Sequence, residues 1–225
     1  MPVVPNRLYS GHAASFFTRA VPPEKTARLG GLYDAYRREY ARSYDLLRAA
    51  MLVSPGGIPG VLTAEAKARV RKRAEAFTEK AVHRSETEYE KRRFLSAYTC
   101  RGAVLLSETA ASFGRVYTLD NELGLADEFL RTVLERARSL GASRIVCPDP
   151  VDPEKLAALI LPEDGLSLVA VSGAFRFDGK AARHFRLDAA AELSEAQRKE
   201  IRRAAALRRS LTTEACAALR RAKEL

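Results

Sequence analysis

The spacing of apolar residues changes twice along the chain, and this change limits the fold more than any other feature. Towards both ends, apolar residues recur every three or four positions, as they do on one face of an α-helix. Between 93 and 172 they gather instead in short runs of the kind that form strands: 94–98, 116–119, 145–147 and 166–171. The pattern predicts a mixed α/β protein with long helices outside its sheet.

Helical patterns separate the strand-like runs. A helix predicted over 125–140 is closed by Gly141, and another over 153–161 would have Asp152 as its N-cap and Pro153 at its first helical position. Alternating strands and helices are typical of a parallel sheet with right-handed crossovers. We therefore expect a small, mostly parallel sheet whose strands lie near 94, 116, 145 and 169.

The helical regions at the two ends are long. A break rich in proline and glycine at 54–60 divides the first region into two helices, the second with Thr63 as its N-cap, and the two predict an antiparallel helical hairpin. The last helix starts with a capping box of Ser194 and Gln197, and we expect it to pack on the hairpin as a helical subdomain. The predicted parts are an N-terminal remnant over 1–23, the hairpin over 24–90, the α/β core over 91–190 and the C-terminal helix over 191–225.

Composition narrows the functional classes. Lys and Arg number 38 against 28 Asp and Glu, which gives a net charge of +10. No run approaches the roughly 18 apolar residues of a membrane span, and the first residues lack the pattern of a signal peptide. Three cysteines without paired spacing argue against a disulfide framework, and no group of Cys, His and acids has the spacing of a metal site. We expect a basic, cytoplasmic protein with no membrane partner, metal or cofactor.

The run over 115–130 leads from a strand through a loop into a helix. Phosphate binds at such junctions in many α/β proteins, because the helix N-terminus offers free N–H groups and the positive end of the dipole. A phosphate loop needs glycines, a lysine and a Ser or Thr, of which only Gly124 is present. The acids around it would repel a triphosphate and favour an ordinary turn capped by acids: Asp120, Glu122, Asp127 and Glu128, with the neutral Asn121 between the first two.

Three stretches carry a family resemblance: 91–102, 116–119 and 147–163. The last contains Cys-Pro-Asp-Pro-Val-Asp-Pro followed by Leu-Ile-Leu-Pro-Glu. Together they resemble an uncharacterised bacterial family with two tandem P-loop ATPase-like domains. The first stretch is similar to the strand and turn that open each domain of that family, and the second to the strand that enters its phosphate loop. The third is similar to the family's run of Cys, Asp-Pro and Ile-Ile-Pro-Glu. The resemblance covers 91 to about 172 and implies a P-loop-like fold.

The chain departs from that family in its phosphate and metal machinery. The phosphate loop is replaced by 120–127, which contains no lysine, and the family's magnesium-positioning acid corresponds to Ser172. The resemblance therefore implies a shortened, degenerate relative that has kept the fold and lost the ATPase activity. Such a protein would act by binding a protein partner, either an intact ATPase relative or a second copy of itself.

One alternative function is non-specific binding of nucleic acid by the basic helices. Tyr33, Tyr36, Tyr40 and Tyr44 alternate with arginines and could stack on bases. Their helical spacing favours a partly buried seam of the hairpin instead.

A second alternative is an enzyme with a divergent acidic site, in which Asp120, Glu122 and Asp127 form a metal or acid–base cluster. Further candidates for ligand contact follow the strand over 145–147, because ligands bind at the carboxyl edge of parallel sheets. They are Cys147, Asp149 and Asp152. Cys147 is either a reactive thiol or, more commonly for such a residue, a small buried side chain.

Overall fold

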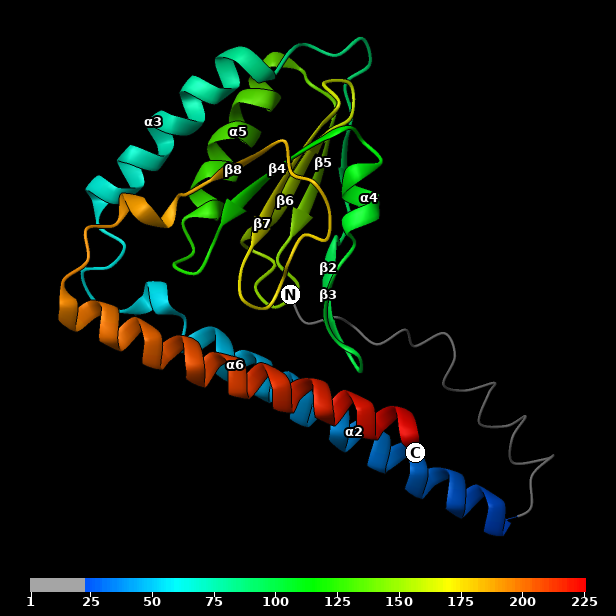
Figure 1. The fold of residues 1–225 in the computed structure, drawn as a ribbon. Helices are drawn as coiled ribbons and strands as arrows, with labels where there is room; N and C mark the ends of the chain where they lie inside the picture. The colour runs from blue at the N-terminus through cyan, green and yellow to red at the C-terminus, as the bar shows by residue number, and fades with distance from the viewer. Residues whose placement is uncertain (1–22) are drawn as a thin grey trace.

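The computed structural model describes residues 23–225 (Figure 1), so almost all of the predicted remnant over 1–23 lies outside the described residues. A six-stranded sheet is flanked by helices, and two long helices lie together below it. The elements, in which η denotes a 3-10 helix, are α2 (Pro23–Leu52), η1 (Pro55–Gly57), α3 (Ala64–Ala81), β1 (Glu90–Arg92), β2 (Ser96–Thr99), β3 (Gly102–Leu105), α4 (Ser107–Ala111), β4 (Arg115–Asp120), α5 (Ala126–Leu140), β5 (Arg144–Pro148), β6 (Leu156–Leu161), β7 (Leu166–Val171), β8 (Arg183–Phe185), η2 (Asp188–Ala190) and α6 (Glu195–Glu224).

The strands of the sheet lie in the order β1-β5-β6-β7-β4-β8. Neighbouring strands are parallel except at β6, which runs antiparallel to both β5 and β7. The predicted α/β class with a mostly parallel sheet is therefore confirmed.

The two faces of the sheet are covered differently (Figure 1). Leu159 and Leu168 face α5 and α3, whereas Ile160 and Val169 face α4 and the β2–β3 hairpin. This alternation is the period of two that a strand imposes on its side chains. Because both faces are covered, β6 is apolar throughout and β7 has a single polar residue, the buried Ser167.

The helix predicted over 153–161 is wrong, since Leu156–Leu161 is the central strand β6. Asp152 and Pro153 belong to a tight turn, in which the N–H of Lys155 donates to the carbonyl oxygen of Asp152 over 2.9 Å. An Asp-Pro pair before a run of Ala and Leu satisfies the pattern of a helix start. The run nevertheless forms a strand, because it hydrogen-bonds to β5 on one side and β7 on the other. Its apolar pattern is too short to distinguish a helix from a strand.

The strand predicted over 94–98 is also placed differently. Phe94 is exposed between two strands, and β2 pairs only with β3, in a separate antiparallel hairpin. The edge of the main sheet beside β5 is formed instead by the shorter β1, in which Lys91 pairs with Ile145 of β5. All of β1 is exposed and charged, so no apolar pattern marks it in the sequence.

The capping residues predicted from the sequence lie at the ends of α3, α5 and α6. The hydroxyl of Thr63 accepts the N–H of Ala66 over 3.1 Å, and Ser194 and Gln197 form both bonds of the capping box. Gly141 ends α5 with φ of 68°, in the left-handed region that favours glycine. None of the helices within residues 23–225 is both long and apolar enough to cross a membrane.

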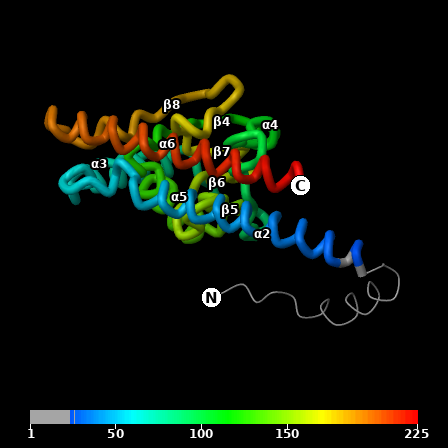
Figure 2. Tube along the Cα trace, turned by 90° about the horizontal axis from the view of Figure 1, so that it is seen from below, coloured from blue at the N-terminus to red at the C-terminus, as the bar shows by residue number. Residues whose placement is uncertain are grey.

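The predicted helical hairpin is wrong, because α2 and α3 pack on different partners. α3 lies along α5, with Val70 and Ala74 buried against the core, whereas α2 lies side by side with α6 (Figures 1 and 2). Ion pairs join the latter two helices: Arg221 to Glu39 at 2.9 Å and Arg42 to Glu214 at 3.1 Å. Of the two helices of the predicted hairpin, only α2 therefore packs with the C-terminal helix.

Glu90 generates a prediction about stability and pH. Its carboxylate accepts hydrogen bonds from Arg138 at 2.7 and 2.8 Å and from the buried Arg144 at 2.7 Å, so its pKa falls to about 2. A lowered folded-state pKa stabilises the protein above the usual pKa of the carboxyl, and this contribution disappears as the pH falls towards 2. Glu90→Gln should therefore destabilise the protein at pH 7, and progressively less between pH 5 and 3, in urea denaturation. Glu86→Gln, with an exposed side chain, is the matched control, and a pH-independent loss in Glu90→Gln would contradict the assignment.

Candidate functional site

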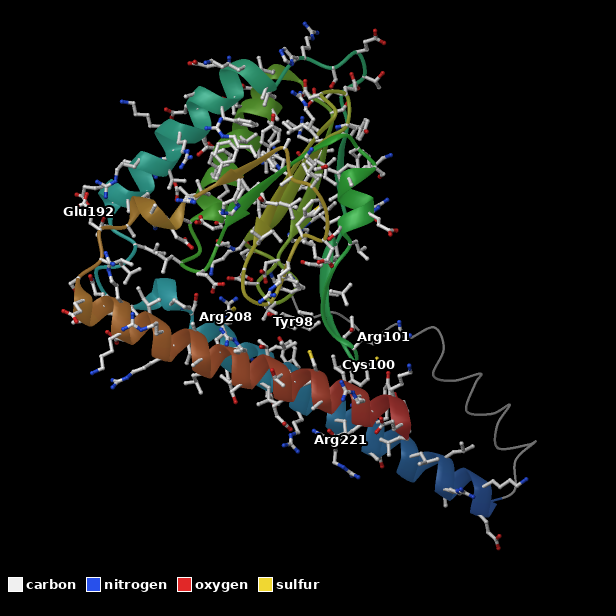
Figure 3. All side chains as sticks on the ribbon, viewed as in Figure 1. Tyr98, Cys100, Arg101, Glu192, Arg208 and Arg221 are labelled. Carbon is white, nitrogen blue, oxygen red and sulfur yellow. The ribbon has the colours of Figure 1, made fainter. Side chains whose placement is uncertain are left out.

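Three adjoining hollows lie between the carboxyl ends of β4, β5 and β7 and the two long helices below them. Arg208 of α6 lines all of these hollows, and it lies on the side of α6 that faces the sheet (Figure 3). We call this region the edge site. The residues used to define it are Ser96, Tyr98, Asn121, Asp149, Ser172 and Arg208.

The turn from β4 to α5 already holds an anion, which is the carboxylate of Asp188. Its two oxygens accept the backbone N–H groups of Glu122 at 2.8 Å and Leu123 at 3.3 Å. Backbone N–H groups at a strand-to-helix turn are the donors that a phosphate loop turns towards its ligand. In this chain they are used by a side chain from η2.

Asp120 completes the link in the opposite direction. Its Oδ1 accepts the backbone N–H groups of Leu187 and, at 2.9 Å, of Asp188. We call these reciprocal bonds the Asp120–Asp188 clamp. Burial, and secondly the nearby Asp120 carboxylate, raise the pKa of Asp188 to about 6. The clamp therefore places two acidic side chains side by side at the end of β4.

The N-terminus of α5 is covered as well. The N–H of Ala126 donates to the side-chain oxygen of Asn121 over 3.1 Å, and η1 packs so closely on the turn that a Cβ on Gly56 would collide with the carbonyl oxygen of Leu123. Gly124 has φ of 88°, so its place in the turn depends on glycine.

The acids in the first turn of α5 connect it to its neighbours. Asp127 accepts the N–H of Leu156 at 2.8 Å and pairs with Arg131 at 2.9 Å, and Glu128 pairs with Arg71 of α3 at 2.6 Å. Asp127 is thus turned towards β6 rather than towards the clamp. Among residues 23–225, no three Cys, His or acidic side chains are grouped so that they could hold a metal ion.

The remaining predicted residues also shape the loops at this edge. Glu122 accepts the backbone N–H of Gly173, which ties the β4 turn to the loop after β7. The hydroxyl of Ser172 accepts the N–H groups of residues 174 and 175, both over 3.3 Å. Asp152 pairs with Lys155 at 2.9 Å.

Asp149 and Cys147 lie at the end of β5. One oxygen of Asp149, Oδ1, accepts the N–H groups of Val151 at 2.9 Å and Asp152 at 3.0 Å, and this closes the turn after the strand. The side chain of Cys147 is 1% exposed within the second face of the core, where burial raises the pKa of its thiol to about 12. A thiol with so high a pKa is a poor nucleophile, so its environment is that of a packing residue.

Four residues of this region were missed by reasoning from sequence. Asp188 binds a turn that lies 66 positions away, and Ser96, Tyr98 and Arg208 meet only because α6 returns below the sheet. Arg208 belongs to one of several pairs of arginines in α6, and nothing in the pattern distinguishes it from the others. Chain topology, rather than local sequence, brings these residues together.

The tyrosines of α2 form a second surface. We call the α2 stripe the exposed set Leu29, Leu32, Tyr33, Tyr36, Tyr40 and Tyr44, whose exposed fractions run from 38% to 61%. The predicted partly buried seam of tyrosines is therefore wrong. The seam with α6 is made instead by other positions, among them the buried Ser43 and Ala218.

Comparison with known proteins gives no further information: no family model, curated protein or solved structure matches the chain.

The clamp generates a prediction about pH. A carboxyl whose pKa is higher in the folded state binds more protons when folded, so its contribution to stability increases as the pH falls from about 6 towards its ordinary value near 4. Asp188→Asn keeps one accepting oxygen and cannot titrate. Compared by urea denaturation, wild type should gain stability relative to Asp188→Asn between pH 7 and 4.5. A difference between the two proteins that stays constant over this range would contradict the raised pKa.

Proposed function

We propose that this chain is a P-loop-like α/β protein that no longer handles nucleotides and acts by binding a protein partner through the α2 stripe. The observation that carries the proposal is the contrast between its two surfaces. The turn that would hold phosphate is occupied by Asp188, whereas a continuous aromatic face of α2 is exposed.

The occupied turn supports the loss of nucleotide binding. A phosphate there would displace Asp188 and lie beside Asp120 and Glu122, with no lysine in the turn. Each like charge within a few ångströms costs on the order of 1 kcal/mol or more, even at a high effective dielectric constant. The helix dipole offers only about 0.5–1 kcal/mol in return. The balance opposes a triphosphate.

The size of the α2 stripe supports a protein partner. A tyrosine buries about 150–250 Å² in an interface, so the tyrosines of the stripe, roughly half exposed, offer on the order of 400 Å². With the two leucines, the stripe reaches the size of the apolar patches that mark interaction sites. Arg221, in the last turn of α6, pairs with Glu39, and the turns of α2 that precede Glu39 extend beyond the end of α6 (Figure 2).

The rim of the stripe indicates the chemistry of that partner. Arg37 lies over the ring of Tyr33 at 5.8 Å and Arg48 over that of Tyr44 at 5.7 Å, so the arginines flank the aromatic face. A helix with an apolar face bordered by carboxylates complements this pattern. A second copy of the chain would instead bring like charges together.

Nucleic acid is the other candidate for a surface of tyrosine and arginine. The stripe favours protein because aliphatic Leu29 and Leu32 continue it, and an aliphatic side chain offers no ring on which a base can stack.

The first test concerns nucleotides. Calorimetric titration with Mg-ATP should give no saturable heat, and a phosphate-release assay should show no turnover, because the turn offers acids where a nucleotide needs cations. Micromolar affinity, or turnover that Asp127→Asn abolishes, would show that the acidic turn is an active site.

The second test concerns the partner. A photoreactive benzoylphenylalanine at Tyr36, within the stripe, should give one discrete protein adduct in cells that naturally make this protein. The same group at Arg38, on the opposite face of α2, should give none and serves as the matched control. Peptide mapping should place the crosslink on an apolar segment rich in Asp and Glu. Adducts with nucleic acid or with a second copy, equal adducts at both positions, or no adduct at Tyr36 would each contradict the proposal.

A further inference from the structure

Two opposite charges line the edge site without pairing with each other. Arg208 and Asp149 both line two of its hollows, yet no ion pair within 4.0 Å joins them. Within residues 23–225, Arg208 makes neither an ion pair nor a hydrogen bond, and only Oδ1 of Asp149 is used by the backbone. The other oxygen of Asp149 and the whole guanidinium group of Arg208 are available.

Neutral hydrogen-bonding groups lie around these charges. The hydroxyl of Ser96 is buried, with 4% of the residue exposed, and it is the one buried side-chain polar atom of the described chain that has no partner. Burial raises the pKa of Tyr98 to about 12, so its hydroxyl stays protonated at neutral pH. Asn121 uses its oxygen on Ala126, and its amide N–H groups have no hydrogen-bond partner among residues 23–225. A buried polar group without a partner costs free energy that a ligand would recover.

Apart from Ser172, the rest of the hollow beside Ser96 is apolar. Leu95, Leu105, Ala158 and Phe175 are among the residues that line it. The hollow has a volume of about 20 Å³, which limits the part of a ligand inside it to a few non-hydrogen atoms. Its position at the carboxyl ends of parallel strands is where open α/β sheets bind small molecules.

We propose that the edge site binds a small α-amino acid. Its carboxylate accepts hydrogen bonds from Arg208, since a guanidinium group matches a carboxylate in shape and charge, and its ammonium group donates to the free oxygen of Asp149. Ser96 donates to the same carboxylate, and the small side chain faces the apolar wall. The site lies apart from the α2 stripe, so this inference does not depend on the proposed protein partner.

Other ligands leave part of the site unsatisfied. An inorganic phosphate or a simple carboxylate would neutralise Arg208 but lie beside the unpaired charge of Asp149. A simple amine would neutralise Asp149 but lie beside the unpaired charge of Arg208. A water molecule could satisfy Ser96, yet it would leave both charges without a counter-ion. A zwitterion offers a counter-charge to both.

The test is isothermal titration calorimetry of the full chain with L-alanine. Propionate, which lacks the ammonium group, and ethylamine, which lacks the carboxylate, are the matched controls. L-alanine should bind saturably, and each control should bind at least about tenfold more weakly, the factor that corresponds to about 1.4 kcal/mol. Glycine and L-serine should bind as L-alanine does if the side chain meets only the wall.

Variants identify the residues. Arg208→Gln and Asp149→Asn should each weaken binding of L-alanine at least about tenfold, and Ser96→Ala should weaken it less. Asp149→Asn retains an oxygen for the turn after β5, and Arg202→Gln, an exposed site on the same helix, should bind as wild type does. Unchanged far-ultraviolet circular dichroism and melting temperature show that a variant is folded. No saturable heat with L-alanine, glycine or L-serine, equal binding of propionate or ethylamine, or wild-type affinity in folded Arg208→Gln or Asp149→Asn would overturn the proposal.

Discussion

The Asp120–Asp188 clamp is the interaction on which the arrangement of this protein depends. Through it, the end of β4 holds the backbone of η2, and η2 holds the turn that leads into α5. The chain between η2 and α6 is only four residues long, so fixing η2 also fixes where α6 starts. The position of α6 decides where Arg208 lies and which helix α2 meets. One pair of carboxylates therefore connects the sheet, the filled anion position and the long helices.

The clamp also explains why the turn between β4 and α5 needs no bound phosphate. A strand, a turn and a helix in this order are typical of phosphate-binding sites, and here Asp188 takes the position of the anion. The N–H groups of such a turn need an acceptor, because unpaired backbone donors are costly when buried. In this protein the acceptor is covalently part of the chain, so no ligand is required for the turn to keep its shape. The raised pKa of Asp188 reflects the cost of burying its carboxylate and, secondly, of holding it beside Asp120. The partner and the amino acid proposed above concern other surfaces of the molecule.

Sequence reasoning succeeded where the determinants are local. The capping box at Ser194, the glycine that ends α5 and three of the six strands of the sheet (β4, β5 and β7) follow from patterns within a few residues. It failed where distant contacts decide, as at β6, which has neighbours on both sides, and at β1, which is short and charged. At the edge site the loops after the strands were predicted. Asp188 and Arg208 were not, because each reaches the site from an element distant in sequence.

The most direct test of the filled anion position is the pH titration of the backbone amides of Glu122 and Leu123 by NMR. If the carboxylate of Asp188 accepts both N–H groups, their proton shifts should change together between pH 4.5 and 7.5 with a midpoint near 6, the pKa of that side chain. In Asp188→Asn the same amides should show no such transition. Amide shifts in wild type that stay constant over this range, or that change in the same way in Asp188→Asn, would contradict the account.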